Sequence, residues 1–343
     1  MIQDWLSLLG SPNLRWVLLG TMFLGMASGI VGSFVLLRKE SLVGEAMSHA
    51  ALPGVCLGFL VAGRELPALM IGAAVFGLIS LWGIRVIHRH SKLKQDTAIG
   101  LILSVFFGLG IVLLTMITNS SAGNKSGLDS YIFGQAASMV SSDVWMMSSM
   151  AILVTAAALL FFKEWKLVIF DPLFAGGLGW KTKTLNSVLS LSIVLIVTAG
   201  IQAVGIILMS ALIITPAIAA RYWTDRLGIM VILAAVIGAF SGVSGTLLSA
   251  VDGGIPTGPV VVLTATAIFI LSFLFAPKRG KLAQVLAHRQ FRRRWKKQQA
   301  LKALDSVQDA PGSNYESWQK ALGAKNNEAK KLWNWLKKNR YLT

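Results

Sequence analysis

Long apolar runs, separated by short polar segments, occupy most of the first 276 residues of the chain. The runs are continuous rather than alternating, and continuous runs of about 20 residues are typical of transmembrane helices rather than of β-barrel strands. The pattern predicts an all-α fold, a polytopic transmembrane helical bundle of about eight or nine spans. The predicted spans are 14–37, 44–62, 66–87, 97–118, 143–162, 184–203, 205–220, 227–250 and 257–276.

One part of this pattern is compatible with several structures. Residues 184–220 could form one long helix, a re-entrant element or two short helices. The segment AGIQAVG at 199–205 is the expected break, because glycine is unfavourable in the interior of a helix.

Composition agrees with a membrane protein. The chain is 55% hydrophobic and only 14% charged, whereas about a quarter of the residues in a soluble domain are charged. The single cysteine, Cys56, cannot form an intrachain disulfide, so cysteine usage does not indicate a redox compartment. A soluble globular protein is therefore not expected.

The net charge of +17 is unevenly distributed. Residues 277–343 hold 17 Lys and Arg against 4 Asp and Glu, whereas residues 1–276 hold 15 against 11. We therefore expect two parts, a transmembrane domain at 1–280 and a short, basic, cytoplasmic helical tail at 281–343.

The basic residues between the predicted spans indicate the orientation. One side of the membrane receives Arg38, Lys39, Arg85, Arg89, Lys92, Lys94, Lys163, Lys166, Lys181, Lys183, Arg221 and Arg226. The other side receives Arg15, Arg64 and Lys125. Because loops rich in Lys and Arg stay in the cytoplasm, we expect the N-terminus outside and the C-terminus inside.

Glycines spaced four residues apart occur within several spans. GMASG at 25–29, GVCLG at 54–58 and GAFSG at 238–242 each place two glycines on one helical face. Such faces allow helices to approach closely in a membrane, so the sequence predicts a tightly packed bundle.

A carboxylate and an imidazole lie four residues apart near the start of the second span. Glu45 and His49 therefore share a helical face, and ionisable groups in membrane helices usually face a cavity or a partner. Oxygen and nitrogen ligands suit a first-row divalent metal ion. Pro53 leaves the carbonyl of His49 without its helical donor, so a helix break is expected at Pro53 and Gly54. The alternative is that Glu45 marks the cytoplasmic end of the span and His49 only bonds to it.

The stretch GSFVLLRKESLVGEAMSHAALPGVCLGF resembles the membrane permeases of bacterial metal-ion ABC importers, the zinc, manganese and iron uptake family. Further stretches resemble the family in the same order along the chain: QDTAIGLILSVFFGLGIVLL (95–114), GLDSYIFGQA (127–136), VGIILMSALIITPAIAARYWT (204–224) and GIPTGPVVVL (254–263). The resemblance covers residues 12–280, approximately.

The resemblance implies that Glu45 and His49 line the ion pathway between two permease subunits. Aspartate is more common in the family at the position of Glu45, and glutamate reaches one carbon further. The family also implies an acid and a histidine before the last span. The corresponding stretch SAVDGGIPTGP at 249–259 has no histidine, so Asp252 is the candidate there, and a loop-entry turn is the competing interpretation.

The chain has no G-x-x-x-x-G-K-[ST] motif, so an ATP-driven process would need a separate ATPase subunit. The cytoplasmic loop FDPLFAGGLGW at 170–180 is the candidate docking element. Asp171 is expected to cap a short helix that begins at Pro172. Ala175 and Gly179 are small residues four apart that would let a partner come close, and the coupling helix of the family looks similar.

The basic tail has two interpretations. The stretch 287–304 is strongly basic, residues 305–314 form an expected linker, and residues 315–342 carry aromatic and leucine residues in an amphipathic pattern. We expect contact with anionic lipid or with the ATPase, and nucleic-acid binding is the less favoured alternative.

These observations predict a non-catalytic permease subunit that imports a divalent metal ion, with manganese or iron favoured over zinc. No cofactor is expected to be permanently bound. Its expected partners are a cytoplasmic ATP-binding subunit, an extracytoplasmic metal-binding protein and a second permease subunit, identical or not. The expected location is the bacterial cytoplasmic membrane. The alternative is an ion-coupled secondary transporter that works without an ATPase and uses Glu45 for proton coupling. An intramembrane metalloprotease is not favoured, because the chain has no H-E-x-x-H motif.

Overall fold

The structure is a computed structural model of the 343-residue chain. It describes residues 12–63, 65–119, 134, 136, 139–252, 255–277, 279–308, 315–323 and 326–338. Most of the predicted motif at 127–136 and part of the predicted linker at 305–314 lie outside these residues. In the part that is described, α-helices account for nearly all regular structure and no β-strand occurs.

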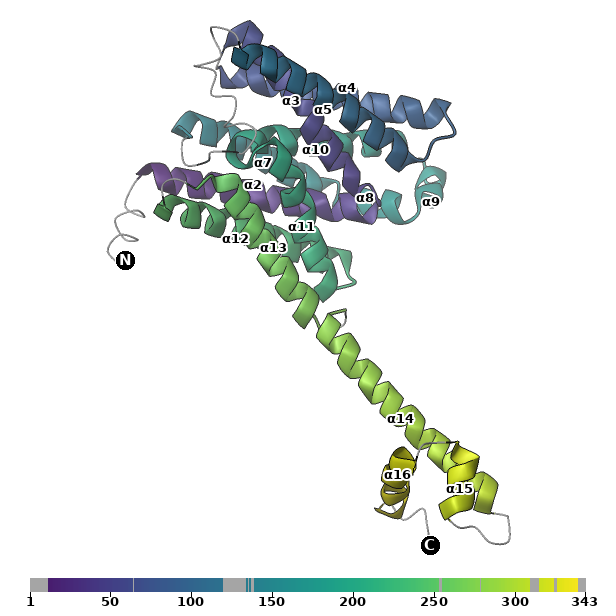
Figure 1. Cartoon of the computed structure of the whole chain (residues 1–343). Coiled ribbons are helices and arrows are strands. Elements are labelled where there is room, and N and C mark those ends of the chain that lie inside the picture. Colours follow the sequence, from purple (N-terminus) through teal and green to yellow (C-terminus); the bar gives the residue numbers. More distant parts are fainter. Residues whose placement is uncertain are drawn as a thin grey trace. The chain divides into compact units, whose positions relative to one another are not determined.

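Nine of the described helices are long and apolar enough to cross a membrane (Figure 1). They are α2 (Pro12–Leu37), α3 (Ser41–Ala62), α4 (Leu66–His90), α5 (Gln95–Asn119), α7 (Ser141–Leu160), α10 (Thr182–Val204), α11 (Ile206–Trp223), α12 (Leu227–Asp252) and α13 (Thr257–Phe275). The predicted all-α polytopic bundle is confirmed. Residues 184–220, for which the sequence allowed several structures, form two helices, α10 and α11. The helices meet at Gly205, where the φ of 95° favours glycine.

The contact between α2 and α12 is built on glycine. A Cβ atom on Gly25 would overlap the backbone carbonyl of Gly238, and one on Gly238 would overlap that of Gly25. Nearby, the hydroxyl of Thr246 donates to that of Thr21 at 3.2 Å. The predicted glycine faces at 25–29 and 238–242 therefore pack against each other.

The second helix pair, α3 and α4, uses the same device. Gly54 of α3 and Gly72 of α4 lie so close that a Cβ on either would overlap the carbonyl of the other. The helices α5, α10 and α11 also pack against α3. As a result α3, which carries the candidate metal ligands, is held by close packing along much of its length.

Two short helices form an elbow between α7 and α10 (Figure 1). They are α8 (Phe162–Phe170) and α9 (Pro172–Gly177). The side chain of Trp165 in α8 is buried, and its indole nitrogen donates to the carbonyl of Leu185 in α10 at 3.2 Å. This bond ties the elbow to the beginning of α10.

The backbone contacts divide the chain into two compact units, Met1–Phe273 and Leu274–Thr343. The second unit contains α14 (Lys281–Gln308), α15 (Tyr315–Leu322) and α16 (Asn326–Lys338). Its small core is centred on Trp318, which is 1% exposed and donates from its indole nitrogen to the carbonyl of Ala300 at 3.0 Å. The division predicted after residue 280 stays a proposal for where the membrane domain ends.

Candidate metal site and docking surface

Glu45 and His49 lie one turn apart in the first half of α3, and both side chains are half-buried. The imidazole of His49 packs edge to face against Phe107 of α5, with ring centroids 4.7 Å apart and planes at 76°. Its Nδ1 atom is buried and has no hydrogen-bond partner among the described residues. The ring of His49 is therefore packed against Phe107, and its Nδ1 atom has no partner among the described residues.

The carboxylate of Glu45 likewise has no ion-pair partner within the described part of the chain. Ser48, between the two residues, is fully buried and donates to the carbonyl of Gly44 at 2.9 Å. The hydroxyl of Ser48 thus bonds to its own helix, so only Glu45 and His49 offer unpartnered donor atoms here.

One oxygen donor and one nitrogen donor do not complete the coordination of a transition metal, which generally takes four or more ligands. No group of three or more His, Cys, Asp and Glu residues lies close enough to hold a metal among the residues that the structure describes. Within the described residues the site is thus incomplete, and a second subunit or water would supply further ligands.

The expected helix break at Pro53 and Gly54 is not present. The helix α3 is continuous from Ser41 to Ala62, with Pro53 inside it. Close packing against Gly72 of α4 explains why one missing backbone hydrogen bond does not interrupt the helix. The carbonyl of His49 still lacks the backbone N–H donor that a residue other than proline would supply at position 53.

The structure does not bring Asp252 to the pair. Five candidate spans lie between α3, the second, and α12, the eighth, so spans that alternate in direction run these two helices the same way. Glu45 lies near the beginning of α3, whereas Asp252 is the last residue of α12. The two residues therefore belong to opposite ends of the bundle.

The predicted short helix in the cytoplasmic loop is present as α9. It begins at Pro172, and the Asp171 carboxylate accepts a hydrogen bond from the backbone N–H of Phe174 at 2.9 Å. This capping bond is the one that the sequence predicted. Gly179 follows the helix with a φ of 82°, a conformation that favours glycine.

The packing of Ala175 differs from the expectation. Ala175 is fully buried within this chain, in a core cluster that includes Trp165 and Phe34, so it cannot meet a partner protein. The surface of the elbow is instead formed by large apolar side chains, and Leu173 is 88% exposed. The exposed apolar residues of the elbow are Phe170, Leu173, Phe174, Leu178 and Trp180.

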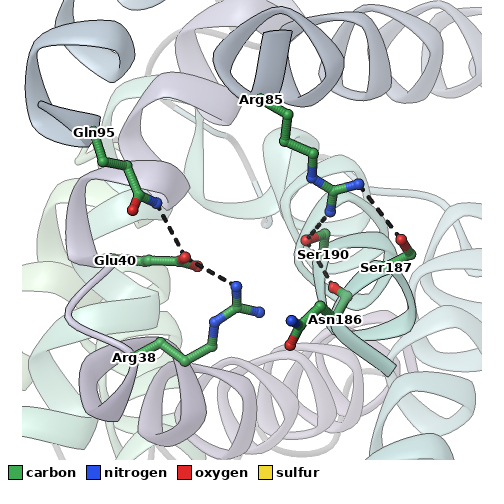
Figure 2. Close-up of polar contacts among 7 residues, drawn as sticks. All are labelled: Arg38, Glu40, Arg85, Gln95, Asn186, Ser187 and Ser190. Atoms are coloured by element: carbon green, nitrogen blue, oxygen red, sulfur yellow. Dashed lines mark hydrogen bonds and ion pairs between the residues drawn. The ribbon is translucent and has the colours of Figure 1, made fainter. Parts of the chain in front are cut away.

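Sequence reasoning missed a polar cluster where α2 passes into α3 (Figure 2). Arg38 forms an ion pair with Glu40 at 2.9 Å, and Gln95 of α5 donates to the same carboxylate oxygen at 3.0 Å. Arg85 of α4 donates to Ser190 of α10 at 2.8 Å. On sequence alone, the arginines are assigned only to the predicted cytoplasmic side. Arg38 pairs with Glu40 two residues away. Gln95, however, lies 55 residues from Glu40, and Ser190 lies 105 residues from Arg85.

Three comparisons with known proteins bear on this geometry. The model of the ABC 3 transport family matches residues 11–276. The manganese transport system membrane protein MntC of Bacillus subtilis (strain 168) is 51% identical over 301 residues, which cover 88% of this chain and 69% of the relative. The zinc transport system membrane protein TroC of Treponema pallidum (strain Nichols) is 43% identical over 278 residues, which cover 81% of this chain and 93% of the relative.

A solved structure has a similar fold. PsaBC from Streptococcus pneumoniae, in complex with Fab, aligns with a TM-score of 0.72 and 33% sequence identity. The alignment covers 81% of this chain and 98% of the other.

Proposed function

The chain belongs to the ABC 3 transport family, and from this premise we propose that it is the permease subunit of an ATP-driven importer of a divalent transition-metal ion. The observation that carries the proposal is the pair Glu45 and His49. It is half-buried, one helical turn apart, and carries unpartnered donor atoms. Ionisable groups at such positions are costly in a membrane and usually serve transport.

Manganese is the favoured ion. Relatives in several organisms are described as manganese transport or import proteins, and one is described as a zinc transport protein. A carboxylate oxygen suits manganese, and an imidazole nitrogen extends the site towards iron and zinc.

A second permease subunit would complete the site. Two copies of Glu45 and His49 facing each other across an interface would supply four ligands, which the described residues of one chain do not supply alone. The pair would then line a pathway between subunits, as the family resemblance implies. The ion would be the transported substrate, and the permease itself would make and break no covalent bond.

A separate ATPase subunit would dock on the elbow. The exposed Leu173, Phe174 and Leu178 offer an apolar surface on a short helix that Asp171 caps, and large exposed apolar patches mark interaction sites. ATP binding and hydrolysis in the partner would move the elbow and switch the opening of the pathway. An extracytoplasmic metal-binding protein would deliver the ion from the other side.

The excess of Lys and Arg on one side supports a cytoplasmic C-terminus and an external N-terminus in the bacterial cytoplasmic membrane. The elbow then lies in the cytoplasm, where ATP is present.

The test is uptake of radioactive manganese by cells that lack their own importer and express this chain with its ATPase and binding protein. We expect uptake to require all three proteins and to stop when the ATPase is inactivated by mutation. Uptake by the chain alone, driven by a proton gradient, would instead establish the ion-coupled secondary transporter.

Copurification tests the elbow. We expect Leu173→Glu to reduce recovery of the ATPase by about tenfold, because a carboxylate would have to be buried in an apolar interface. Leu93→Glu is the matched control, since Leu93 is also an exposed leucine in a predicted cytoplasmic loop. Equal recovery with both variants would place the ATPase elsewhere.

A further inference from the structure

A polar cavity of about 480 Å³ lies beside the junction of α2 and α3. Its walls come from that junction, from α4, from the first residue of α5 and from α10. Figure 2 shows two groups of polar side chains that point into the same space, one around Arg38 and one around Arg85. Neither Glu45 nor His49 lines this cavity.

The group around Arg38 contains the one carboxylate of the cavity. Glu40 accepts from Arg38 Nη2 at 2.9 Å and from Gln95 Nε2 at 3.0 Å through the same oxygen. The charge of Glu40 is therefore already balanced. Arg38 lines the cavity, and its Nη1 atom is buried and has no hydrogen-bond partner in the described part of the chain.

The group around Arg85 has no carboxylate. Arg85 donates from Nη2 to Ser190 Oγ at 2.8 Å and from Nη1 to Ser187 Oγ at 3.4 Å, and both acceptors are neutral. Lys183 of α10 lines the same cavity and adds a further positive charge. Three permanent cations, Arg38, Arg85 and Lys183, thus face a single carboxylate.

An excess of positive charge with an unpartnered donor favours an anion. The planar guanidinium group matches the oxygens of a phosphate or carboxylate in paired hydrogen bonds, and the cavity volume falls in the usual range for small-ligand sites. A metal cation would be repelled by the same charges. We propose that this cavity binds a phosphate-type oxyanion, supplied either by the headgroup of an anionic lipid or by free inorganic phosphate.

Its place in the bundle supports the lipid as one source. The junction of α2 and α3 carries Arg38 and Lys39, which the positive-inside rule places at the cytoplasmic surface, and anionic lipids are abundant in that leaflet. An anion held by Arg38 and Arg85 together would link the α2–α3 junction to α4 and α10. The proposal does not depend on which substrate the protein transports.

The test compares two double variants of the full-length chain. Arg85→Gln with Lys183→Gln removes two cavity charges, whereas Arg89→Gln with Lys181→Gln removes two exposed charges outside the cavity, one from the same helix α4 and one from the residue that precedes α10. The protein is purified in neutral detergent, and its thermal unfolding midpoint is measured against phosphatidylglycerol, phosphatidylcholine and inorganic phosphate.

We expect an anion to raise the midpoint of the unaltered chain and of the Arg89/Lys181 variant, and the Arg85/Lys183 variant to bind at least tenfold more weakly. Stabilisation by phosphatidylglycerol alone assigns the site to a lipid headgroup, and stabilisation by inorganic phosphate assigns it to the free ion. The proposal is overturned if neither anion acts beyond phosphatidylcholine, or if both double variants lose binding equally, since diffuse surface charge would explain that.

A milder variant covers the case in which the cavity variant does not fold. Arg85→Lys keeps the charge and removes the planar fork, so we expect binding at least threefold weaker than that of the unaltered chain. Unchanged binding by this variant would overturn the role of the guanidinium.

Discussion

Two helix pairs in the bundle pack in the same way and carry different chemistry. Gly25 meets Gly238 between α2 and α12, and Gly54 meets Gly72 between α3 and α4. From one end to the other, α12 has no ionisable residue before Asp252, its last. The helix α3 carries Glu45 and His49 in addition to its glycine contact. Close packing therefore needs no charge and does not explain the charges in α3, for which we propose a role in binding the transported ion.

The largest expected effect is on manganese uptake, and it comes from changing the ionisable residues of α3. We expect Glu45→Gln combined with His49→Ala to reduce manganese uptake by about 100-fold, because metal affinity falls steeply when the supporting groups of a site are lost. Recovery of the assembled transporter should not change, since neither side chain has an internal hydrogen-bond partner within the described residues. Uptake is measured with radioactive manganese.

The matched control changes the same residue types outside the site. Glu65→Gln and His90→Ala alter exposed residues at the two ends of α4, and we expect normal uptake from both. If the double variant in α3 also transports normally, Glu45 and His49 are not ligands.

A smaller effect is expected on the stability of the α2–α12 contact. Gly238→Ala places a Cβ against the carbonyl of Gly25, so we expect a loss of about 1–3 kcal/mol from overpacking. Gly108→Ala in α5 is the control, because nothing lies within 4 Å of the added atom there. That variant should be neutral or slightly stabilising, since alanine favours helix by about 1 kcal/mol.

Unfolding midpoints of the two glycine variants in detergent measure this difference. Equal midpoints would mean that the backbone contact between α2 and α12 relaxes at no cost, and the comparison between the helix pairs would then fail.

The smallest expected effect concerns Pro53. Pro53→Ala restores a backbone donor to the carbonyl of His49, so we expect a gain in stability of about 0.5–1.5 kcal/mol. Thermal unfolding measures the gain, and uptake measured in parallel should fall only slightly, because α3 is already continuous. A large loss of uptake would show that the free carbonyl takes part in transport.

The sequence predicted features that depend on neighbouring residues. Hydropathy located the spans, AGIQAVG located the break at Gly205, and the spacing of Asp171 and Pro172 located the cap of α9. Each of these follows from a window of residues that are close along the chain. The metal-binding roles of Glu45 and His49 stay predictions.

The features that sequence could not predict depend on distant residues. Ala175 is buried in a cluster that includes Trp165 and Phe34, and small size alone does not distinguish an internal contact from a partner surface. The bond between Arg85 and Ser190 spans 105 residues of sequence. Such pairs arise only when the helices are assembled, so the polar cavity was not expected.

The hydrogen bond from Trp165 to Leu185 has a mechanical consequence. Its acceptor belongs to the first turn of α10. The bond therefore couples the elbow to that helix. If an ATPase docks on the elbow as proposed, a displacement of Leu173 would be passed on to α10. Because α10 packs against α3, the displacement would reach the helix that carries His49.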